Sequence, residues 1–241
     1  MLSGGHGFVA TRASVPTSIE AVPIETWVVE DTLAFPEARD RLIALGLNRR
    51  QAIILSELCS LTLLSGALFV LKGGRARQYA QVLVRINCET SGMIEIPMGL
   101  TSGTPLRNAL SAMPHARRLG VLNADLSPLE VYGARLLDTY FEAALEGNNN
   151  PQPLVLTCLG GEMSLPLPDV VRHIAVIIDL DQPWDAGTQK LEEVDIESAP
   201  LMAPLRSRLL GRLPEIQPEY QDQVERALVK ALSPAEAMAY A

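Results

Sequence analysis

Helix patterns and short strand patterns alternate along this chain of 241 residues, and this alternation limits the fold to classes that mix helices with strands. The clearest helix start is Ser127-Pro128-Leu129-Glu130, which supplies a cap residue, proline at the first helical position and glutamate at the third. Apolar residues then recur at spacings of three and four as far as Leu145. The pattern predicts one long amphipathic helix over 129–145.

Cap residues and glycines divide residues 36–74 into three short helical patterns. Asn48 caps the second pattern, with Gln51 three residues further on, as in a capping box. Ser60 has the residue type of a cap for the third pattern, which Gly73 and Gly74 end. We therefore expect a trihelical unit with tight connections: a first helix over 36–45, a second after Asn48 and a third over 61–71.

Six segments are expected to form β-strands. Residues 79–87 and 93–98 alternate on either side of a turn at Gly92, which predicts a hairpin. Gly160-Gly161 separates 154–158 from 163–167 and predicts a second hairpin. The apolar run 174–178 is typical of a buried strand. The remaining expected elements are a short strand at 24–29 and helices at 104–113, 200–210 and 219–232.

These elements predict an α+β fold with an N-terminal trihelical unit, two β-hairpins or one mixed sheet, and C-terminal helices. Gly147, three asparagines and two prolines make 148–153 the expected domain boundary or long loop. The expected parts are an irregular arm at 1–35, a basic helical unit with a hairpin and the long helix at 36–147, and an acidic part at 148–241. The last two parts form one domain if a single sheet draws strands from both.

Charge is distributed unevenly along the chain. Residues 39–118 contain eleven Lys or Arg and four Asp or Glu, a net charge of +7, whereas the whole chain carries −8. A basic block within an acidic protein is typical of a surface that meets an anionic partner. Cations at the start of a helix oppose its dipole unless an anion compensates. The expected phosphate-binding residues are Arg49, Arg50, Lys72, Arg75 and Arg77.

The basic block favours a non-enzymatic, nucleic-acid-associated protein, either a regulator or a subunit of a nucleoprotein complex with DNA or RNA. The expected helix over 61–71 is apolar nearly all round, so it lacks the polar side chains that read base edges. Such a helix is buried in a core or in a subunit interface, which makes a protein partner or a homo-oligomer expected. The alternative function is a structural subunit of a larger bacterial assembly without nucleic-acid contact.

The stretch Leu45-Gly46-Leu47-Asn48, with the aliphatic residues that follow it, resembles a known family. Those residues are Ala52, Leu55, Leu58, Leu61 and Leu64. Over about 30 residues the stretch is similar to the core segment of the D subunit of the bacterial flagellar master transcription activator, to which regulators on conjugative elements are related. The resemblance implies an oligomeric, DNA-associated regulator. The rest of the chain departs from that family, whose members are much shorter.

Asp179 and Asp181 directly follow the apolar run 174–178. Carboxylates at the carboxyl end of a buried strand stand where open α/β sheets place phosphate and metal chemistry, and Mg²⁺ prefers oxygen ligands. A second alternative is therefore a Mg²⁺-dependent hydrolase that uses these two residues. No phosphate-cradling glycine loop with a lysine accompanies them, so the favoured explanation is the start of a solvated acidic loop.

Other site types lack support in the sequence. The three cysteines are far apart and form no CxxC pair, and the three histidines stand apart from any nucleophile motif. We assign no catalytic residue, cofactor or metal ligand. The first fifteen residues lack the apolar run of a signal peptide, and residues 61–71 are too few to span a bilayer. We expect a cytoplasmic bacterial protein without a membrane partner.

Overall fold

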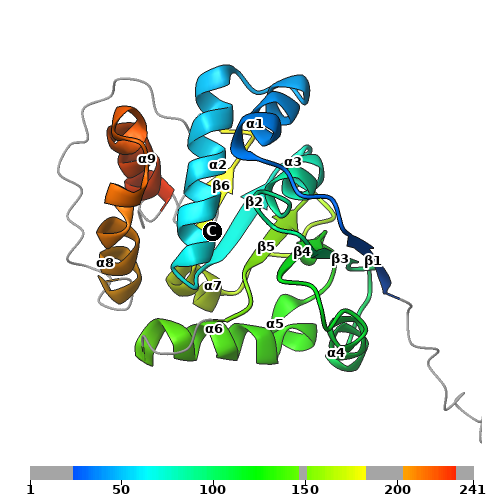
Figure 1. The fold of residues 1–241 in the computed structure, drawn as a ribbon. Helices are drawn as coiled ribbons and strands as arrows, with labels where there is room; N and C mark the ends of the chain where they lie inside the picture. Colours follow the sequence, from blue (N-terminus) through cyan, green and yellow to red (C-terminus); the bar gives the residue numbers. More distant parts are fainter. Residues whose placement is uncertain (1–23, 147–150, 183–202, 232–241) are drawn as a thin grey trace, which may run out of the picture.

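One six-stranded sheet with helices on both faces organises the computed structural model, which describes residues 24–146, 151–182 and 203–231 (Figure 1). The strands are β1 (Glu25–Val29), β2 (Leu68–Lys72), β3 (Ser91–Glu95), β4 (Arg118–Leu122), β5 (Leu154–Cys158) and β6 (Ala175–Asp179). The α-helices are α1 (Phe35–Ala44), α2 (Arg49–Leu64), α3 (Ala76–Leu83), α4 (Thr104–Ser111), α5 (Leu129–Tyr132), α6 (Ala134–Glu146), α7 (Asp169–Ile174), α8 (Ala203–Gly211) and α9 (Pro218–Ala231). Short 3₁₀ turns are η1 (Ala124–Leu126) and η4 (Leu213–Glu215).

The strand order is β1-β3-β4-β5-β2-β6, and the sheet draws strands from both sides of residues 147–150. Strands β2 to β6 are parallel to their neighbours, and β1 alone pairs antiparallel, with β3. The predicted mixture of helices and strands in one mixed sheet is confirmed. The predicted hairpins are not formed, because each parallel strand reaches the next through a helix on one face of the sheet.

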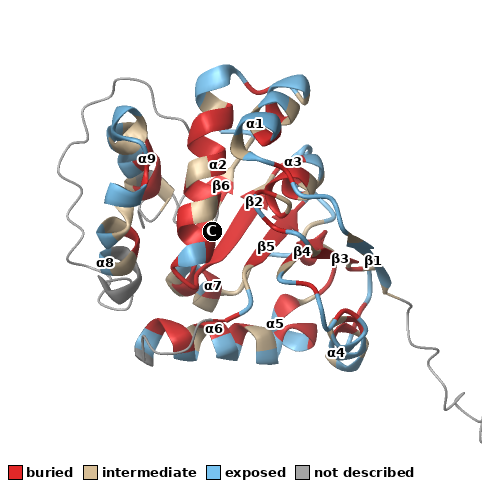
Figure 2. Ribbon diagram, viewed as in Figure 1, coloured by how far each residue is buried: buried red, intermediate tan, exposed pale blue. Residues whose placement is uncertain are grey.

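Alternate side chains of each central strand enter two different cores. Phe69 and Leu71 of β2 pack with α1, α2, α3 and α9, whereas Leu68 and Val70 pack with α4 to α7. All four side chains are buried, and the central strands are buried along their length (Figure 2). A parallel sheet covered on both faces requires such continuous apolar strands, which is why their sequences lack polar alternation.

The direction of each crossover decides which face its helix covers. The connection from β2 to β3 passes β5 and β4 in one direction and places α3 on the face of α1 and α2. The later connections to β4, β5 and β6 run the opposite way and place α4 to α7 on the other face. Right-handed crossovers produce this division.

The predicted trihelical unit is wrong in its second half. Asn48 caps α2 as predicted, and Gln51 completes the capping box, with hydrogen bonds of 2.8 and 3.1 Å. Ser60 begins no new helix, because α2 continues through it to Leu64. Gly66, whose φ is +68°, follows just after the end of the helix. The apolar residues after Gly66 form β2, so the predicted helix over 61–71 is the end of one helix and the start of a strand.

The predicted strand over 79–87 is mainly helix. Residues 76–83 form α3, whose buried residues include Ala76, Tyr79, Ala80 and Leu83, at helical spacing. The alternating apolar residues of 79–87 suggested a strand. Over part of this segment the same residues also fit the helical spacing. Of the predicted pair only the second segment is a strand, β3, and its neighbours are β1 and β4.

The predicted long helix over 129–145 is interrupted. Gly133 separates α5 from α6, and the side chain of Ser127 caps neither helix. Ser127 instead donates a hydrogen bond of 2.7 Å to Pro97 O and accepts one of 2.8 Å from Leu100 N. The hydroxyl therefore joins the loop after β3 to the segment after β4.

The C-terminal half agrees with the sequence at four predicted elements. Strands β5 and β6 occupy the predicted apolar runs, α8 covers most of the predicted helix over 200–210, and α9 covers most of the predicted final helix. Residues 163–167 form no strand, because the chain after β5 crosses to β6 through α7 rather than returning beside β5. Much of the acidic segment 179–197 lies outside the described residues.

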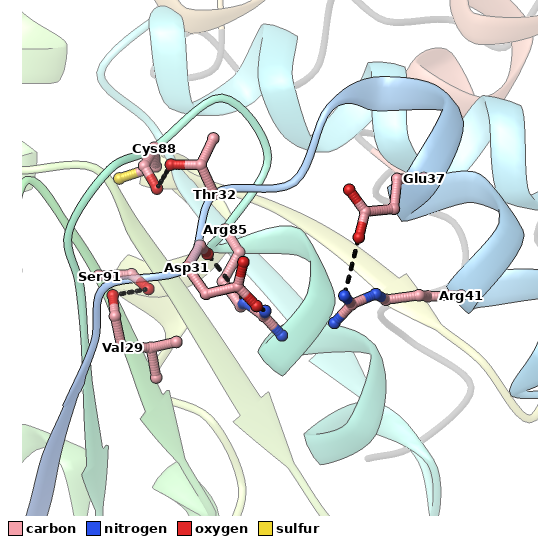
Figure 3. A network of polar contacts seen from close by, with 8 residues as sticks. All are labelled: Val29, Asp31, Thr32, Glu37, Arg41, Arg85, Cys88 and Ser91. Carbon is pink, nitrogen blue, oxygen red and sulfur yellow. Dashed lines mark hydrogen bonds and ion pairs between the residues drawn. The ribbon is translucent and has the colours of Figure 1, made fainter.

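The N-terminal strand β1 is joined to the sheet by a short polar segment (Figure 3). Thr32 donates to Cys88 O at 2.9 Å, and Asp31 forms an ion pair with Arg85. Leu33 is fully buried and exchanges backbone hydrogen bonds with Arg85 and Asn87. These contacts hold the predicted strand at 24–29 against β3, so it is part of the fold.

Replacing Asn48 by alanine tests the capping box of α2. The change removes the acceptor for the Gln51 N–H, and we expect a loss of about 1 kcal/mol in the free energy of unfolding. Denaturant titration followed by circular dichroism measures it. Asn48→Asp, which keeps the acceptor, should retain most of the stability; equal stability of Asn48→Ala and the wild type would contradict the assignment.

Candidate functional site at the carboxyl edge of the sheet

Polar and charged residues gather where the parallel strands end. The carboxyl ends of β2 to β6 lie along one edge of the sheet because these strands share a direction. Residues at or just beyond these ends are Lys72, Glu95, Asn123, Asp125, Thr157, Asp179 and Asp181. In open α/β sheets this edge is the one that binds ligands.

Two glycine pairs face this edge at the point where the connections diverge. The chain leaves β2 toward one face of the sheet and leaves the neighbouring β5 toward the other. The loops that follow contain Gly73-Gly74 and Gly160-Gly161, and Gly73 N donates to Cys158 O at 3.0 Å between them. Divergence of adjacent crossovers marks the switch point at which such sheets bind ligands.

Gly73-Gly74 does not end a helix, as the sequence suggested, but connects β2 to α3. A strand, glycines and a helix are the framework of a phosphate-binding loop, yet only three residues separate β2 from α3. The Asp181 carboxylate lies beside Gly73, where its oxygens would be 2.9 Å from an added Cβ. A short loop next to a carboxylate does not provide the cradle that a polyphosphate needs.

A polar network joins the first turn of α3 to the ends of β3, β4 and β5. Arg77 donates two hydrogen bonds to the Glu95 carboxylate, at 2.6 and 2.8 Å. Asn123 Nδ2 donates to Glu95 Oε1 at 3.0 Å, and Asn123 N donates to Thr157 Oγ1 at 3.0 Å. Four residues distant in sequence therefore fix one another, and a bidentate Arg–carboxylate pair stands at the centre.

Asn123 has two unusual properties. Its backbone is left-handed, with φ +57°, a conformation that asparagine tolerates better than most residues. Its carboxamide is buried, and among the described residues the Oδ1 atom has no hydrogen-bond partner. Buried acceptors without partners are rare in folded proteins, and they occur where water or a ligand completes the set.

Asp125 shapes the glycine loop after β5. Its two carboxylate oxygens accept hydrogen bonds from Leu159 N and Gly160 N, both at 3.0 Å. Burial raises the pKa of the neighbouring Cys158 thiol, the Asp125 carboxylate raises it further, and Lys72 opposes the shift. Cys158 is therefore a neutral core thiol rather than a nucleophile.

Most of the basic block is neutralised within the protein. Six of its eleven cations form ion pairs with described carboxylates: Arg39, Arg41, Lys72, Arg77, Arg85 and Arg117. The predicted phosphate-binding residues Lys72 and Arg77 belong to this group, paired with Asp179 at 3.9 Å and with Glu95. Net charge along the sequence therefore overstates the positive charge that the surface presents.

The other three predicted residues gather at the turn before α2. Arg49 and Arg50 are the exposed first residues of α2, and the first turn of this helix contains no acidic residue. The exposed Arg75 Nη1 donates to Leu45 O at 2.6 Å, which brings its guanidinium onto the same turn. In the described part of the chain, no carboxylate forms an ion pair with Arg75. We call Arg49, Arg50 and Arg75 the arginine cluster.

Gly46 makes this approach of Arg75 possible. A Cβ at position 46 would lie 2.2 Å from Arg75 Nη1, and the φ of Gly46 is +107°. The antiparallel course of α2 and β2 places the start of α2 toward the carboxyl ends of the strands (Figure 1). The cluster and the switch point therefore belong to the same edge of the sheet.

Asp179 and Asp181, the residues of the hydrolase hypothesis, have structural partners. Asp179 Oδ1 accepts a hydrogen bond of 3.1 Å from Asp181 N, and Asp179 Oδ2 faces Lys72. Within residues 24–146, 151–182 and 203–231, no three His, Cys, Asp or Glu side chains are grouped closely enough to hold a metal ion.

Sequence reasoning missed Glu95, Asn123, Asp125 and Thr157. Each stands at or shortly after the end of an apolar strand, the same signal that selected Asp179.

In the part of the chain that the structure describes, no helix is long and apolar enough to cross a membrane. No protein-family model, curated protein or solved structure matches the chain.

Asp125→Asn tests the role of this carboxylate. The variant replaces one acceptor by an amide donor that faces a backbone N–H, so we expect a loss of about 1–3 kcal/mol in stability. Hydrogen exchange should accelerate at the Leu159 and Gly160 amides. Asp138→Asn, at an exposed position of α6, is the matched control. Unchanged exchange at both amides would show that Asp125 does not hold the loop.

Proposed function

We propose that the protein binds nucleic-acid phosphates through the arginine cluster and acts as a non-enzymatic regulator or as a subunit of a nucleoprotein complex. The observation that carries the proposal is the approach of Arg75 to the turn that carries Arg49 and Arg50. The three arginines are exposed residues from two segments about 25 residues apart, and the Arg75 side chain reaches the turn that precedes Arg49 and Arg50. Basic side chains grouped on one surface are the electrostatic footprint of a phosphate-binding protein.

Helix geometry adds to this electrostatic surface. Arg49 is the first residue of α2, and Arg75 directly precedes α3, so two helix N-termini lie beside the cluster. Each N-terminus carries a partial positive charge and backbone N–H groups that favour anions. The segment that resembles the transcription-activator subunit ends within α2 and contains two of the three arginines.

Lys72 and Arg77 have a smaller part in this proposal than the sequence suggested. Asp179 and Glu95 offset their charges, and a phosphate would have to compete with these carboxylates. The remaining contacts come from about three guanidinium groups. At a slope of about −0.9 per neutralised phosphate, affinity for duplex DNA should fall roughly 40-fold between 50 and 200 mM salt.

A second function, a subunit of a protein assembly, is favoured by exposed apolar side chains on the loops of the same edge. Met98 follows β3 and Met163 follows β5, and they are 54% and 66% exposed. Methionine is adaptable and frequent at binding surfaces. Partner binding through these loops would coexist with phosphate contacts at the arginine cluster.

Charge reversal in the cluster tests the primary proposal. Binding of purified protein to a random DNA duplex and to a random single-stranded RNA is measured by fluorescence anisotropy at 50 and 200 mM salt. We expect salt-sensitive binding by the wild type and a loss of at least tenfold in Arg49→Glu/Arg50→Glu, since two attractions become repulsions. Circular dichroism checks that the variant is folded.

The matched control is Arg107→Glu/Arg135→Glu. Both arginines are exposed and lie on α4 and α6, on the other face of the sheet, and the double change alters net charge by the same amount. A site-specific interaction leaves this control near wild-type affinity. Equal losses in both variants would indicate a general charge effect, and no binding by folded wild-type protein at 50 mM salt would refute the proposal.

A further inference from the structure

Exposed apolar side chains are concentrated on the three segments that follow β3, β4 and β5. These segments are residues 97–103, 123–132 and 159–168, and we call them the loop platform. Single exposed apolar residues are ordinary on a protein surface, whereas a concentration of them marks an interaction site. Of the nine large apolar residues that are exposed in the described part of the chain, the platform carries five: Met98, Val131, Leu159, Met163 and Leu165.

Hydrogen bonds join the three segments of the platform. The carboxylate and the carbonyl of Asp125 accept from three backbone N–H groups within 159–165, at 2.8 to 3.0 Å. Ser127 Oγ donates to Pro97 O and accepts from Leu100 N. Each of the five exposed apolar side chains stands within a few residues of these hydrogen bonds. The surface is therefore ordered before a partner binds, which lowers the entropic cost of binding.

The platform is acidic. Its exposed charged residues are Glu130 and Glu162, and its sequence contains no Lys or Arg. Arg107, Arg135 and Arg172 lie beyond its ends, on α4, α6 and α7. Two acidic platforms would repel each other, and phosphates would be repelled as well, so the charge disfavours a second copy or a nucleic acid at this surface. A basic partner is complementary to it.

The backbone of the platform favours a helical partner over an extended one. N–H groups along its loops already donate within the protein, among them those of Leu100, Leu159, Ser164 and Leu165. A partner strand needs a row of free backbone N–H and C=O groups, so these anchored loops suit it poorly. A helix satisfies its own backbone groups and presents apolar side chains on one face.

We propose that the loop platform binds a basic amphipathic helix of a partner protein. The apolar face of that helix covers the exposed Met98 and Met163 and their apolar neighbours, and its Lys or Arg side chains pair with Glu130 and Glu162. The inference rests on the second proposed function, a subunit of a protein assembly, and specifies the chemistry of the partner.

The probe is a fluorescent helical peptide of about 18 residues, with leucines on one face and lysines on the other. Its binding to the full chain is measured by fluorescence anisotropy. One control peptide has the same composition in scrambled order, and another has glutamate in place of each lysine. We expect the basic amphipathic peptide to bind about tenfold or more tightly than either control, because only this peptide matches both the apolar side chains and the charge of the platform.

Two variants remove the two kinds of contact separately. Glu130→Lys/Glu162→Lys reverses the charge of the platform, and Met98→Ser/Met163→Ser removes its two most exposed apolar side chains. All four positions are exposed, so we expect folded proteins, which circular dichroism checks. Each variant should bind the basic peptide about tenfold or more weakly than the wild type.

The matched controls make the same changes outside the platform. Asp222→Lys/Glu225→Lys reverses two exposed carboxylates of α9, on the other face of the sheet. Leu64→Ser/Leu145→Ser replaces two exposed leucines at the ends of α2 and α6. Both controls should keep wild-type affinity for the peptide.

Equal binding of the three peptides, or undiminished binding by either platform variant, would overturn the proposal. Self-association of the free chain in analytical ultracentrifugation, abolished by Met98→Ser/Met163→Ser, would assign the platform to a second copy. That result would refute the basic partner and leave the assembly function standing. Arg49→Glu/Arg50→Glu should keep peptide binding, because the arginine cluster lies outside the platform, so failure of nucleic-acid binding is a separate outcome.

Discussion

The parallel sheet, buried on both faces, is the constraint on which the other features of the structure depend. Because β2 to β6 share one direction, each must return through a helix, and those helices cover both faces with apolar side chains. Polar residues are then confined largely to helix surfaces and to the two edges where strands begin and end. Glu95, Asn123 and Thr157 meet because the neighbouring strands β3, β4 and β5 end at the same edge.

The positive charge that the protein surface presents depends on ion pairs across the fold more than on the composition of the basic block. The acidic partners of the basic block are not its neighbours in the chain: Arg77 meets Glu95 and Arg85 meets Asp31 across the fold. Partly exposed pairs of this kind contribute little net stability. Five arginines of the basic block form no ion pair with a described carboxylate: Arg49, Arg50, Arg75, Arg107 and Arg118. The first three lie near the turn before α2.

The sequence predicted elements well where caps or bounded apolar runs were present. Asn48 with Gln51 located the start of α2, and the runs over 154–158 and 174–178 are strands. The prediction failed at residues 61–71, where the end of the helix and the start of the strand are both mainly apolar and only Ser65-Gly66 separates them. Strand β4 was not predicted because Arg118 and Gly120 interrupt its apolar pattern.

The residues of the candidate site were likewise predicted only in part. Arg49, Arg50 and Arg75 were selected from charge, and the structure adds that Arg75 turns back to Leu45, 30 residues earlier. The network of Arg77, Glu95, Asn123 and Thr157 was invisible because its members come from four segments. Their proximity follows from strand order, which neither hydrophobic pattern nor charge specifies.

The central claim is that the carboxyl edge of the sheet, at the turn before α2 and the start of α3, is the surface that meets phosphates. Amide chemical-shift mapping of the isotope-labelled protein with a short DNA duplex at low salt tests it residue by residue. The account predicts perturbed amides within 45–50 and 73–78, with those of α4 to α7 unchanged. Perturbations confined to the α4–α7 face, or none while the duplex is bound, would contradict it.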